Sequence, residues 1–425
     1  MSALLATYGA LTRALTPFAP LVLLWRKRIG KEDGARLGER IGFAGRPRGE
    51  KPVAWLHGAS VGEGLALMPL VERLIERGFD VLVTTGTVTS ASVIGSRLPP
   101  GAIHQYVPLD APKYWTRFLD HWRPNLVLLA ESELWPNMID AVERRGVPIA
   151  LVNARLSDRS FRRWLKAPRA IGNLLAKVDL CLAQSQDDAG RLLHLGAPRV
   201  QVAGNLKYDV PPPPCDAEKL AEVSALIGSR PVWVAASTHA GEEDIAAQVH
   251  RSLRARFDLV TIVAPRHPER GAEIADAAAA DGLATQLRSR GDEIGLSTGF
   301  YVADTVGEMG LLYRLASVVF LGKSLASGGG QNPIEPAKLG CAILHGPRVE
   351  NFIEVYRELE RAQGALEVGD ADTLARALAM LFADSARLRQ MARIAHETVN
   401  NFAGATDNIM NALEPYFMQM QMERR

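Results

Sequence analysis

The feature that most constrains the fold is a repeated alternation of short apolar segments with segments of helical length. In the first half of the chain the apolar segments include 52–58, 124–131 and 147–154, and the second half repeats the pattern at 231–238 and 259–267. These segments are rich in Val, Leu and Ile and are almost continuously apolar, which is typical of parallel strands covered by helices on both faces. The pattern therefore predicts an α/β fold built from doubly wound parallel sheets.

A proline-rich stretch, VPPPPC at 210–215, separates the two series. Four consecutive prolines cannot enter a helix or a central strand, and they make a semi-rigid spacer. A chain of 425 residues is also too long for one ordinary core. We therefore predict two Rossmann-like domains at 29–209 and 216–400, joined by the linker 210–215. The helix-like segment 401–425 is predicted to pack back on the first domain.

The first 28 residues differ in kind from the rest. A largely apolar stretch at 3–25 is followed directly by the basic triplet RKR, and no basic region precedes it, which argues against a cleaved secretory signal. About 20 apolar residues would span a bilayer, but Arg13 lies near the middle and Pro17 and Pro20 interrupt the helix. We expect residues 1–28 to be a membrane anchor that either spans the bilayer or lies in its interface, with the next domain on the cytoplasmic side. The alternative is an amphipathic first helix packed on the domain.

Charge adds to the expectation of a membrane partner. Residues 1–48 carry nine basic and three acidic side chains, and the run at 155–169 carries six cations interleaved with Phe161 and Trp164. Such faces suit anionic headgroups, where each nearby cation contributes about 1 kcal/mol. A solvated basic helix face is the alternative. The net charge of the whole chain is only +2, so no overall field favours nucleic acid as a partner.

Cysteine and histidine patterns give no sign of a metal. The three cysteines have no CxxC spacing, and the nine histidines form no HExxH pair. Free thiols in a reducing compartment are the expected state. We predict no metal and no bound cofactor.

In the first half, several charged residues follow predicted strands directly. Glu63 comes after the strand ending HGAS, Glu131 and Glu133 after LVLLA, and Lys207 after VQVAGNL. In doubly wound sheets ligands bind beyond the carboxyl ends of the strands, so we expect these side chains to gather at a functional edge. Taken singly, Glu63 could be a helix first-turn acid and Lys207 a solvated residue between domains.

The second half carries four polar segments at comparable positions, at 236–244, 264–270, 304–310 and 327–337. Glycines in SGGGQNPIEP allow close backbone approach, and the helix that begins near Pro333 directs amides outward, which suits a phosphate. Arg266 can offer a charge-assisted contact, and Glu335 suits ribose hydroxyls. Neither GxGxxG nor GxxxxGKS is present, which disfavours a dinucleotide oxidoreductase and a P-loop enzyme.

Together these features indicate a nucleotide-sugar glycosyltransferase with two domains facing across a cleft. The second domain would hold the nucleotide, and a carboxylate of the first would deprotonate the acceptor hydroxyl. Cations and helix amides would stabilise the departing phosphate without a metal.

The motifs HGASVGE, ESELWPN, NARLSDRS, GNLKYD, STHAGEE, PRHPER, DTVGEMGLLY and GGGQNPIEPA occur in this order. Together they resemble the 3-deoxy-D-manno-octulosonic acid (Kdo) transferase family of Gram-negative lipopolysaccharide synthesis, over about residues 25–405. The resemblance implies a GT-B fold, CMP-Kdo as donor, a lipid A precursor resembling lipid IVA as acceptor, inversion at the anomeric carbon and a location at the cytoplasmic side of the cell inner membrane.

The resemblance also assigns roles to residues. Glu63 matches the proton acceptor, and Glu131 and Lys207 match positions that stabilise the transition state. The matches to the CMP-binding segments are Pro265, Arg266, Val306, Gly307, Glu308, Asn332, Pro333, Ile334 and Glu335. Two residues depart from the family pattern: Lys323 stands where a second glycine is expected, and Gln331 where histidine is common.

Two other functions remain open at this point. One keeps the fold but uses a UDP-sugar, as a GT-B transferase or an epimerase would. The other is a membrane-bound nucleotide sensor without catalysis, although a sensor needs no base on the acceptor side.

Overall fold

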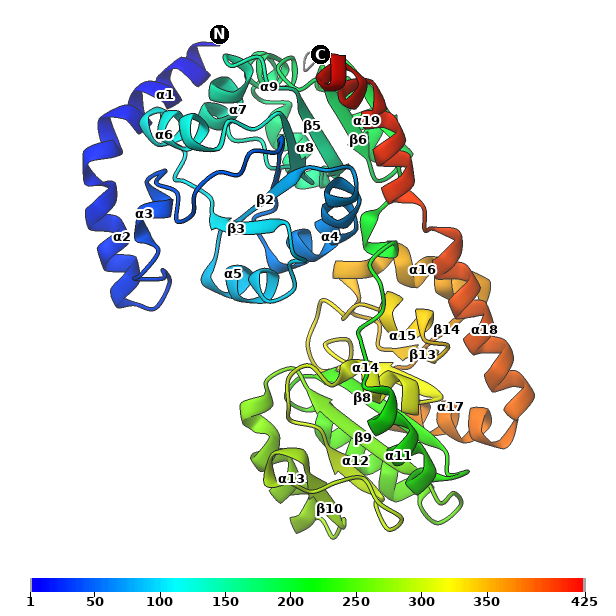
Figure 1. Cartoon of the computed structure of the whole chain (residues 1–425). Coiled ribbons are helices and arrows are strands. Elements are labelled where there is room, and N and C mark those ends of the chain that lie inside the picture. Colours follow the sequence, from blue (N-terminus) through cyan, green and yellow to red (C-terminus); the bar gives the residue numbers. More distant parts are fainter. Residues whose placement is uncertain (1, 423–425) are drawn as a thin grey trace. The chain divides into compact units, whose positions relative to one another are not determined.

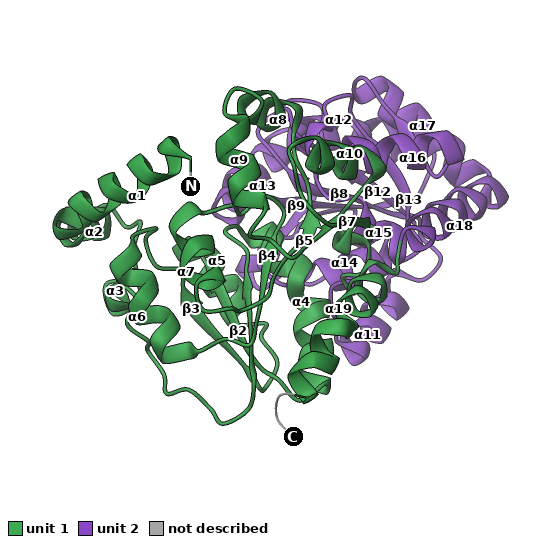
Figure 2. Ribbon diagram, turned by 90° about the horizontal axis from the view of Figure 1, so that it is seen from above, with its two compact units in different colours: residues 1–210, 403–425 green, residues 211–402 purple. Residues whose placement is uncertain are grey.

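The computed structural model describes residues 2–422 and divides the chain into two compact units. Unit 1 comprises residues 1–210 and 403–425, and unit 2 comprises residues 211–402 (Figure 2). Each unit is built around one sheet, and the chain runs through unit 1, then unit 2, and returns to unit 1 for its last helix (Figure 1). The prediction of two doubly wound α/β domains is confirmed.

The sheet of unit 1 has seven strands in the order β3-β2-β1-β4-β5-β6-β7, and each described pair is parallel. The strands are β1 (Val53–His57), β2 (Asp80–Thr85), β3 (Ala102–Tyr106), β4 (Leu126–Ala130), β5 (Ile149–Ala154), β6 (Leu180–Ala183) and β7 (Val200–Val202). The strand order reverses between β1 and β4, and in such sheets this switch point is where ligands bind.

Helices cover both faces of this sheet because its strands are apolar on both faces. One face packs Trp55 against Trp115, Phe118 and Trp122, and the other packs Leu56 among further aliphatic side chains. The helices of unit 1 are α1 (Ala3–Leu15), α2 (Ala19–Arg28), α3 (Leu37–Arg40), α4 (Val61–Glu76), α5 (Val88–Gly95), α6 (Pro112–Trp122), α7 (Pro136–Glu143), α8 (Asp158–Trp164), α9 (Pro168–Leu175), α10 (Gln186–His194) and α19 (Ala405–Met422), with short 3-10 turns η1 (Thr16–Phe18) and η2 (Leu206–Tyr208).

The last helix, α19, completes the core of unit 1. Ile409, Leu413 and Phe417 are buried with the aliphatic side chains of α4. At the start of α19, the backbone N–H groups of Gly404 and Thr406 donate hydrogen bonds to the carboxylate of Asp209, at 2.7 and 2.5 Å. One side chain thus ties the outgoing end of unit 1 to the returning segment.

The first helices lie against unit 1 with one face and leave the other face open. Leu23 and Ala19 are buried, and the Asn137 amide donates to the Thr12 hydroxyl at 2.9 Å. No helix among residues 2–422 is both long enough and apolar enough to cross a membrane. The open face carries large apolar side chains spaced alternately four and three residues apart, which places them on one stripe of the helix. This apolar stripe consists of Leu4, Tyr8, Leu11, Leu15, Phe18, Val22, Trp25 and Ile29.

The aromatic residues of the basic run at 155–169 were expected to lie among its cations on a face that suits anionic headgroups, and the structure differs. Phe161 and Trp164 of α8 are half-buried and pack against the core of unit 1. The reason is the helical period, since residues three apart share the buried face of α8. The exposed residues include five cations, together with Asp158 and Leu165. The five cations are Arg159, Arg162, Arg163, Lys166 and Arg169.

Unit 2 repeats the architecture with the strand order β10-β11-β9-β8-β12-β13-β14, again parallel, and its switch point lies between β8 and β12. The strands are β8 (Val232–Thr238), β9 (Val260–Pro265), β10 (Thr285–Leu287), β11 (Phe300–Val302), β12 (Val318–Leu321), β13 (Ala342–His345) and β14 (Ala365–Glu367). The helices are α11 (Ala217–Ile227), α12 (Glu242–Leu253), α13 (Gly271–Ala280), α14 (Met309–Leu315), α15 (Ile334–Lys338), α16 (Ile353–Ala362), α17 (Ala371–Ala383) and α18 (Ser385–Asn401), with 3-10 turns η3 (Pro268–Arg270), η4 (Arg288–Arg290) and η5 (Glu350–Phe352).

The proline-rich segment belongs to unit 2 and is not a free spacer. Arg314 of α14 donates to the Pro213 carbonyl oxygen at 2.8 Å. A β-carbon at Gly310 would collide with the carbonyl oxygen of Pro214, so the absence of a side chain there lets the prolines lie on α14. The segment is held because its carbonyl groups remain acceptors although proline has no N–H.

Candidate active site

Glu63 lies in the first turn of α4, directly beyond the carboxyl end of β1. Its carboxylate accepts the backbone N–H of Ala59 and the hydroxyl of Ser60, both at 2.8 Å. Ser60 is also the N-cap of α4, and its hydroxyl oxygen accepts the N–H of Glu63. Burial raises the pKa of Glu63 although the Ser60 hydrogen bond opposes it, and the charges of Glu133 and Glu131 add to the rise. The turn therefore holds a carboxylate with increased proton affinity.

Glu133, which follows β4, has the opposite electrostatic setting. Its carboxylate accepts the indole N–H of Trp135 at 2.6 Å and lies 3.3 Å from Nε2 of His57, the last residue of β1. Burial raises the pKa of Glu133, but the hydrogen bonding and charge of His57 and the Trp135 contact outweigh it, so the pKa lies below its ordinary value. Two neighbouring carboxylates are thus driven apart in acidity, a pattern that suits one of them to proton transfer.

Glu131 and Lys207 form an ion pair at the same edge. Lys207 Nζ lies 3.3 Å from Oε1 of Glu131, and both side chains are about three-quarters buried. Lys207 is carried by η2, which packs against α4. The amide oxygen of Asn153, the second-last residue of β5, accepts the N–H of Leu206 at 3.0 Å and so fixes the start of that turn.

The structure therefore brings Glu63, Glu131 and Lys207 to one edge of the unit 1 sheet. Glu131 and Asn153 both adopt left-handed backbone conformations, with φ of 49° and 51°, which non-glycine residues rarely do. Such strain is maintained by surrounding structure and is concentrated at functional sites. His57 and Asn153 were not identified from the sequence, because a buried strand-end residue resembles any other core position until its neighbours are known.

In unit 2, Arg266 follows β9 as expected. Pro265 ends the strand and is buried, whereas Arg266 is exposed, and its backbone N–H donates to the Thr238 carbonyl oxygen at 3.0 Å. Within residues 2–422 the guanidinium of Arg266 has no hydrogen bond or ion pair. A free guanidinium beyond the end of a central strand can take an anionic ligand.

Glu242, in the first turn of α12, organises the loops around Arg266. Its carboxylate accepts four backbone N–H groups, at 2.7 to 2.9 Å, from residues at the ends of β8 and β12. These donors are His239, Lys323, Ser324 and Leu325. Glu242 was not identified as a site residue from the sequence. The available signal was its match to Glu63, an acid in the first turn of the helix that follows the strand at the switch point.

The glycine-rich loop and the start of α15 form the next segment. Gly329 and Gly330 have φ of 124° and 67°, and a β-carbon on Gly330 would lie 2.9 Å from Cα of Val349. The Asn332 amide oxygen accepts the N–H of Ile334 at 3.0 Å, and its nitrogen lies 3.4 Å from Glu335 Oε1. Pro333 is the N-cap residue of α15, and Ile334, the first residue of that helix, is buried. The glycines are needed here because the loop packs too closely for side chains.

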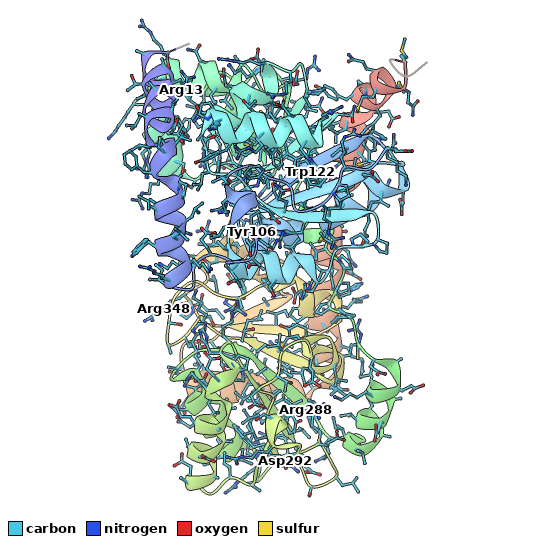
Figure 3. The ribbon with its side chains drawn as sticks, turned by 60° about the vertical axis from the view of Figure 1, so that its left-hand side comes forward. Arg13, Tyr106, Trp122, Arg288, Asp292 and Arg348 are labelled. Carbon is cyan, nitrogen blue, oxygen red and sulfur yellow. The ribbon has the colours of Figure 1, made fainter. Side chains whose placement is uncertain are left out.

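The 306–308 turn is more internally bonded than expected. Val306 is 88% exposed and Gly307 has φ of 95°, so the backbone of this turn is accessible. The carboxylate of Glu308, however, accepts hydrogen bonds from Arg288 at 2.9 Å, Lys219 at 2.7 Å and the Thr305 hydroxyl; Arg288 is labelled in Figure 3. Burial raises the pKa of Glu308, but these partners overcome that effect and lower it to about 2. Its side chain holds the turn to α11 and η4.

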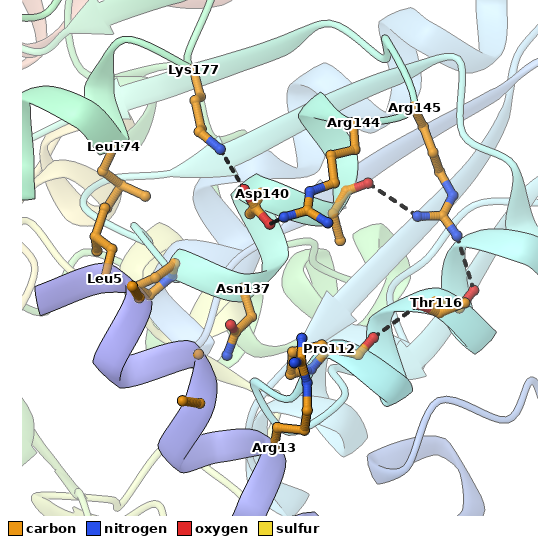
Figure 4. Close-up of a pocket in the computed structure, with 15 residues that line it drawn as sticks. Leu5, Arg13, Pro112, Thr116, Asn137, Asp140, Arg144, Arg145, Leu174 and Lys177 are labelled. Atoms are coloured by element: carbon orange, nitrogen blue, oxygen red, sulfur yellow. Dashed lines mark hydrogen bonds and ion pairs between the residues drawn. The ribbon is translucent and has the colours of Figure 1, made fainter. Parts of the chain in front are cut away.

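A separate pocket lies beneath α1 in unit 1 (Figure 4). The first helix contributes Leu5, Gly9 and Arg13, and the opposite walls come from α6, α7 and α9. Arg13 therefore points along the protein side of the helix, away from the apolar stripe, which explains how a cation is accommodated in this apolar segment. Arg144 and Lys177 pair with Asp140 at 2.8 and 2.5 Å on the opposite wall.

Solved structures share this architecture at low sequence identity. A UDP-GlcNAc 2-epimerase from Neisseria meningitidis matches with a TM-score of 0.58 and 14% identity, over 86% of this chain and 100% of that chain. A glycosyltransferase from Rickettsia africae matches with a TM-score of 0.58 and 12% identity, over 87% of this chain and 98% of that chain. The two parallel seven-stranded sheets and these matches define the GT-B fold.

Sequence comparison places the chain within this class. A family model described as 3-deoxy-D-manno-octulosonic-acid transferase matches residues 35–210. The 3-deoxy-D-manno-octulosonic acid transferase of Bordetella pertussis is 37% identical over 96% of this chain and 99% of that protein, and that of Haemophilus influenzae is 33% identical over 90% and 91%. The chain belongs to the 3-deoxy-D-manno-octulosonic acid transferase family.

Proposed function

We propose that this enzyme transfers Kdo from CMP-Kdo to a lipid A precursor resembling lipid IVA, with inversion at the anomeric carbon. Membership of the family supports the transferred sugar. The observation that carries the mechanism is the Glu63 carboxylate, held at the switch point of unit 1 by Ala59 and Ser60 with a raised pKa.

Glu63 takes the proton of the acceptor hydroxyl. As the hydroxyl oxygen forms a bond to the anomeric carbon of Kdo, the bond from that carbon to the phosphate oxygen breaks and CMP leaves with the bonding electrons. A raised pKa makes the ionised Glu63 carboxylate a stronger base than that of Glu133. Glu131 and Lys207 act on the transition state, with Glu131 orienting Lys207 through their ion pair.

The donor is bound by unit 2 in this proposal. Arg266 supplies a cation to the phosphate, with Pro265 closing the strand behind it. The backbone of the 306–308 turn and the segment 332–335 contact the nucleotide, with the Glu335 carboxylate suited to ribose hydroxyls. Cationic side chains neutralise the leaving phosphate, so the reaction as proposed requires neither metal nor cofactor.

Residues 1–28 attach the enzyme to the cytoplasmic side of the inner membrane by lying in the interface. The apolar stripe on α1, η1 and α2 supports this, since an amphipathic helix in the interface buries one apolar face. The exposed cations of α8 and the Arg26-Lys27-Arg28 triplet add attraction to anionic headgroups.

Mass analysis tests the transfer directly. The enzyme is incubated with CMP-Kdo and the lipid A precursor in detergent, and the lipid product is measured by mass spectrometry. Addition of one or more Kdo residues is the expected result, and their number is read from the same spectrum. An unmodified lipid would favour the non-catalytic sensor.

A UDP-sugar enzyme is the second candidate, because solved structures with this fold include a UDP-GlcNAc 2-epimerase with bound UDP-GlcNAc. Thermal denaturation with CMP and with UDP separates the two functions. A greater rise in melting temperature with CMP is expected, and a greater rise with UDP would reject the CMP donor.

A further inference from the structure

The switch point of unit 2 carries a lysine in an unusual backbone conformation. Lys323, two residues beyond β12, has φ of 58°, in the left-handed region that glycine adopts at much lower cost. The conformation is imposed by Glu242, whose carboxylate accepts the N–H groups of Lys323 and of the two residues that follow. The chain therefore has a lysine at a position where the backbone conformation favours glycine.

This side chain is half-buried and has no anionic partner. Its stem lies over the glycine-rich loop, since a β-carbon on Gly329 would lie 3.2 Å from Cε of Lys323. No carboxylate in residues 2–422 is within ion-pair distance of its ammonium group. Both oxygens of Glu242 are occupied by backbone donors, and Glu350, which lies beside Gly328, makes no ion pair with it.

Other groups around Lys323 are also unsatisfied. The Nε2 atom of His239, at the end of β8, and the hydroxyl of Ser327 are buried without a hydrogen-bond partner in the part of the chain that the structure describes. The loops that carry them are in contact, since a β-carbon on Gly241 would lie 3.4 Å from that of Ala326. Buried polar atoms are rarely left unpaired, so these atoms indicate the place of a ligand.

The positive charge of Lys323 is not neutralised by an ion pair within residues 2–422. Burial lowers the pKa of His239, and although the Glu242 charge opposes that effect, the charges of Lys323, His267 and Arg266 lower the pKa further. These groups are therefore close enough to interact. Lys323 and Arg266 leave a net positive field next to two unpaired hydrogen-bonding atoms, which matches an anionic ligand with several oxygens.

We propose that Lys323 is a donor-binding residue whose ammonium pairs with an anionic group of the nucleotide sugar, beside Arg266 and His239. The inference rests on the proposed function, because it names a further contact in the donor site. The anionic group is the phosphate of the nucleotide or the carboxylate of the sugar, and the chemistry of recognition is the same for both.

The test compares the affinities of four proteins for CMP, CMP-Kdo and cytidine by calorimetry. The proteins are the wild type, Lys323→Gly, Lys323→Met and the matched control Lys113→Met, whose lysine is exposed on α6. The glycine variant suits the left-handed backbone, so it retains the fold, and the methionine variant removes the charge while keeping the stem. Melting temperatures check that all four are folded.

We expect both Lys323 variants to bind CMP about tenfold or more weakly than the wild type, with cytidine affinity unchanged. A loss for CMP-Kdo without a loss for CMP would assign the contact to the sugar carboxylate instead and still support the inference. Equal losses for cytidine and CMP, or CMP and CMP-Kdo affinities within twofold of the wild type in both variants, would overturn it. If the wild type itself binds neither CMP nor CMP-Kdo, the donor assignment fails and the role of Lys323 fails with it.

Discussion

At the residue scale, the site separates two glutamates that look equivalent in the sequence. Glu63 and Glu133 both follow central strands, but the first is buried beside like charges and the second lies beside His57 and the Trp135 indole. The strand-end rule predicted both positions. It could not predict their different acidities, because these depend on neighbours that are brought together only by folding.

The pH dependence of transfer should report the environment of Glu63. The base must be ionised, so kcat/KM is expected to fall as the pH drops through the pKa of Glu63, which lies above that of an ordinary glutamate. Ser60→Ala removes a hydrogen bond that favours the carboxylate, so the acidic limb of the pH profile should move to higher pH. Ser60→Thr should keep the wild-type limb. An acidic limb that is unchanged in Ser60→Ala would show that the pH profile does not report the ionisation of Glu63.

A second pH effect concerns Glu308 and stability. Its folded-state pKa of about 2 lies below the unfolded value of about 4.3, so its contribution is present above the unfolded value and is lost as the pH falls toward 2. The denaturation midpoint of unit 2 should therefore fall more steeply between pH 5 and about 3 in the wild type than in Glu308→Gln. Urea denaturation at both pH values measures this. Parallel pH dependence in the two proteins would contradict it.

At the element scale, the loops that follow the strands are held by acids in the first turns of helices. Glu63 and Glu242 occupy matching places after β1 and β8, and each accepts a backbone N–H of its own loop. Glu63 was recognised from its motif in the sequence, whereas Glu242 was not. The four N–H donors of Glu242 come from loops about 80 residues apart in the sequence, and only the sheet brings them together.

Removal of the Glu242 carboxylate should loosen the donor loops. Glu242→Ala leaves four N–H groups, one buried and three part-buried, without this acceptor, and we expect unit 2 to be destabilised by at least about 2 kcal/mol, with weaker CMP binding. Glu242→Gln keeps one acceptor oxygen, so its stability should lie between those of the wild type and Glu242→Ala. Chemical denaturation and calorimetry measure both effects. Wild-type stability in the alanine variant would show that the loops do not depend on Glu242.

The first helices offer a test of the membrane surface. Phe18 and Trp25 are 59% and 60% exposed on the apolar stripe, so Phe18→Asp with Trp25→Glu should lower binding to anionic vesicles by at least about tenfold, without changing CMP affinity. Leu193→Asp is the matched control, since Leu193 is 56% exposed on α10 and lies outside the stripe. Equal vesicle binding by all three proteins would exclude the stripe as the membrane-facing surface.

At the scale of the whole molecule, the chain is two similar sheets with different chemistry at their switch points. The alternation of apolar strands with helices predicted both sheets, because parallel strands buried on two faces leave a clear pattern. The role of the prolines was less predictable, since their contact with α14 depends on Gly310 and Arg314, about 100 residues away. Unit 1 presents the candidate base, and unit 2 presents cations suited to a nucleotide.

In the proposed mechanism Glu63 of unit 1 is the base and unit 2 binds the donor. The most direct test measures Kdo transfer by mass spectrometry and CMP affinity by calorimetry in Glu63→Gln and Arg266→Ala. Glu63→Gln should lose transfer almost completely with CMP affinity nearly unchanged, whereas Arg266→Ala should bind CMP about tenfold more weakly. Wild-type turnover in Glu63→Gln would exclude Glu63 as the base, because the amide cannot accept the proton.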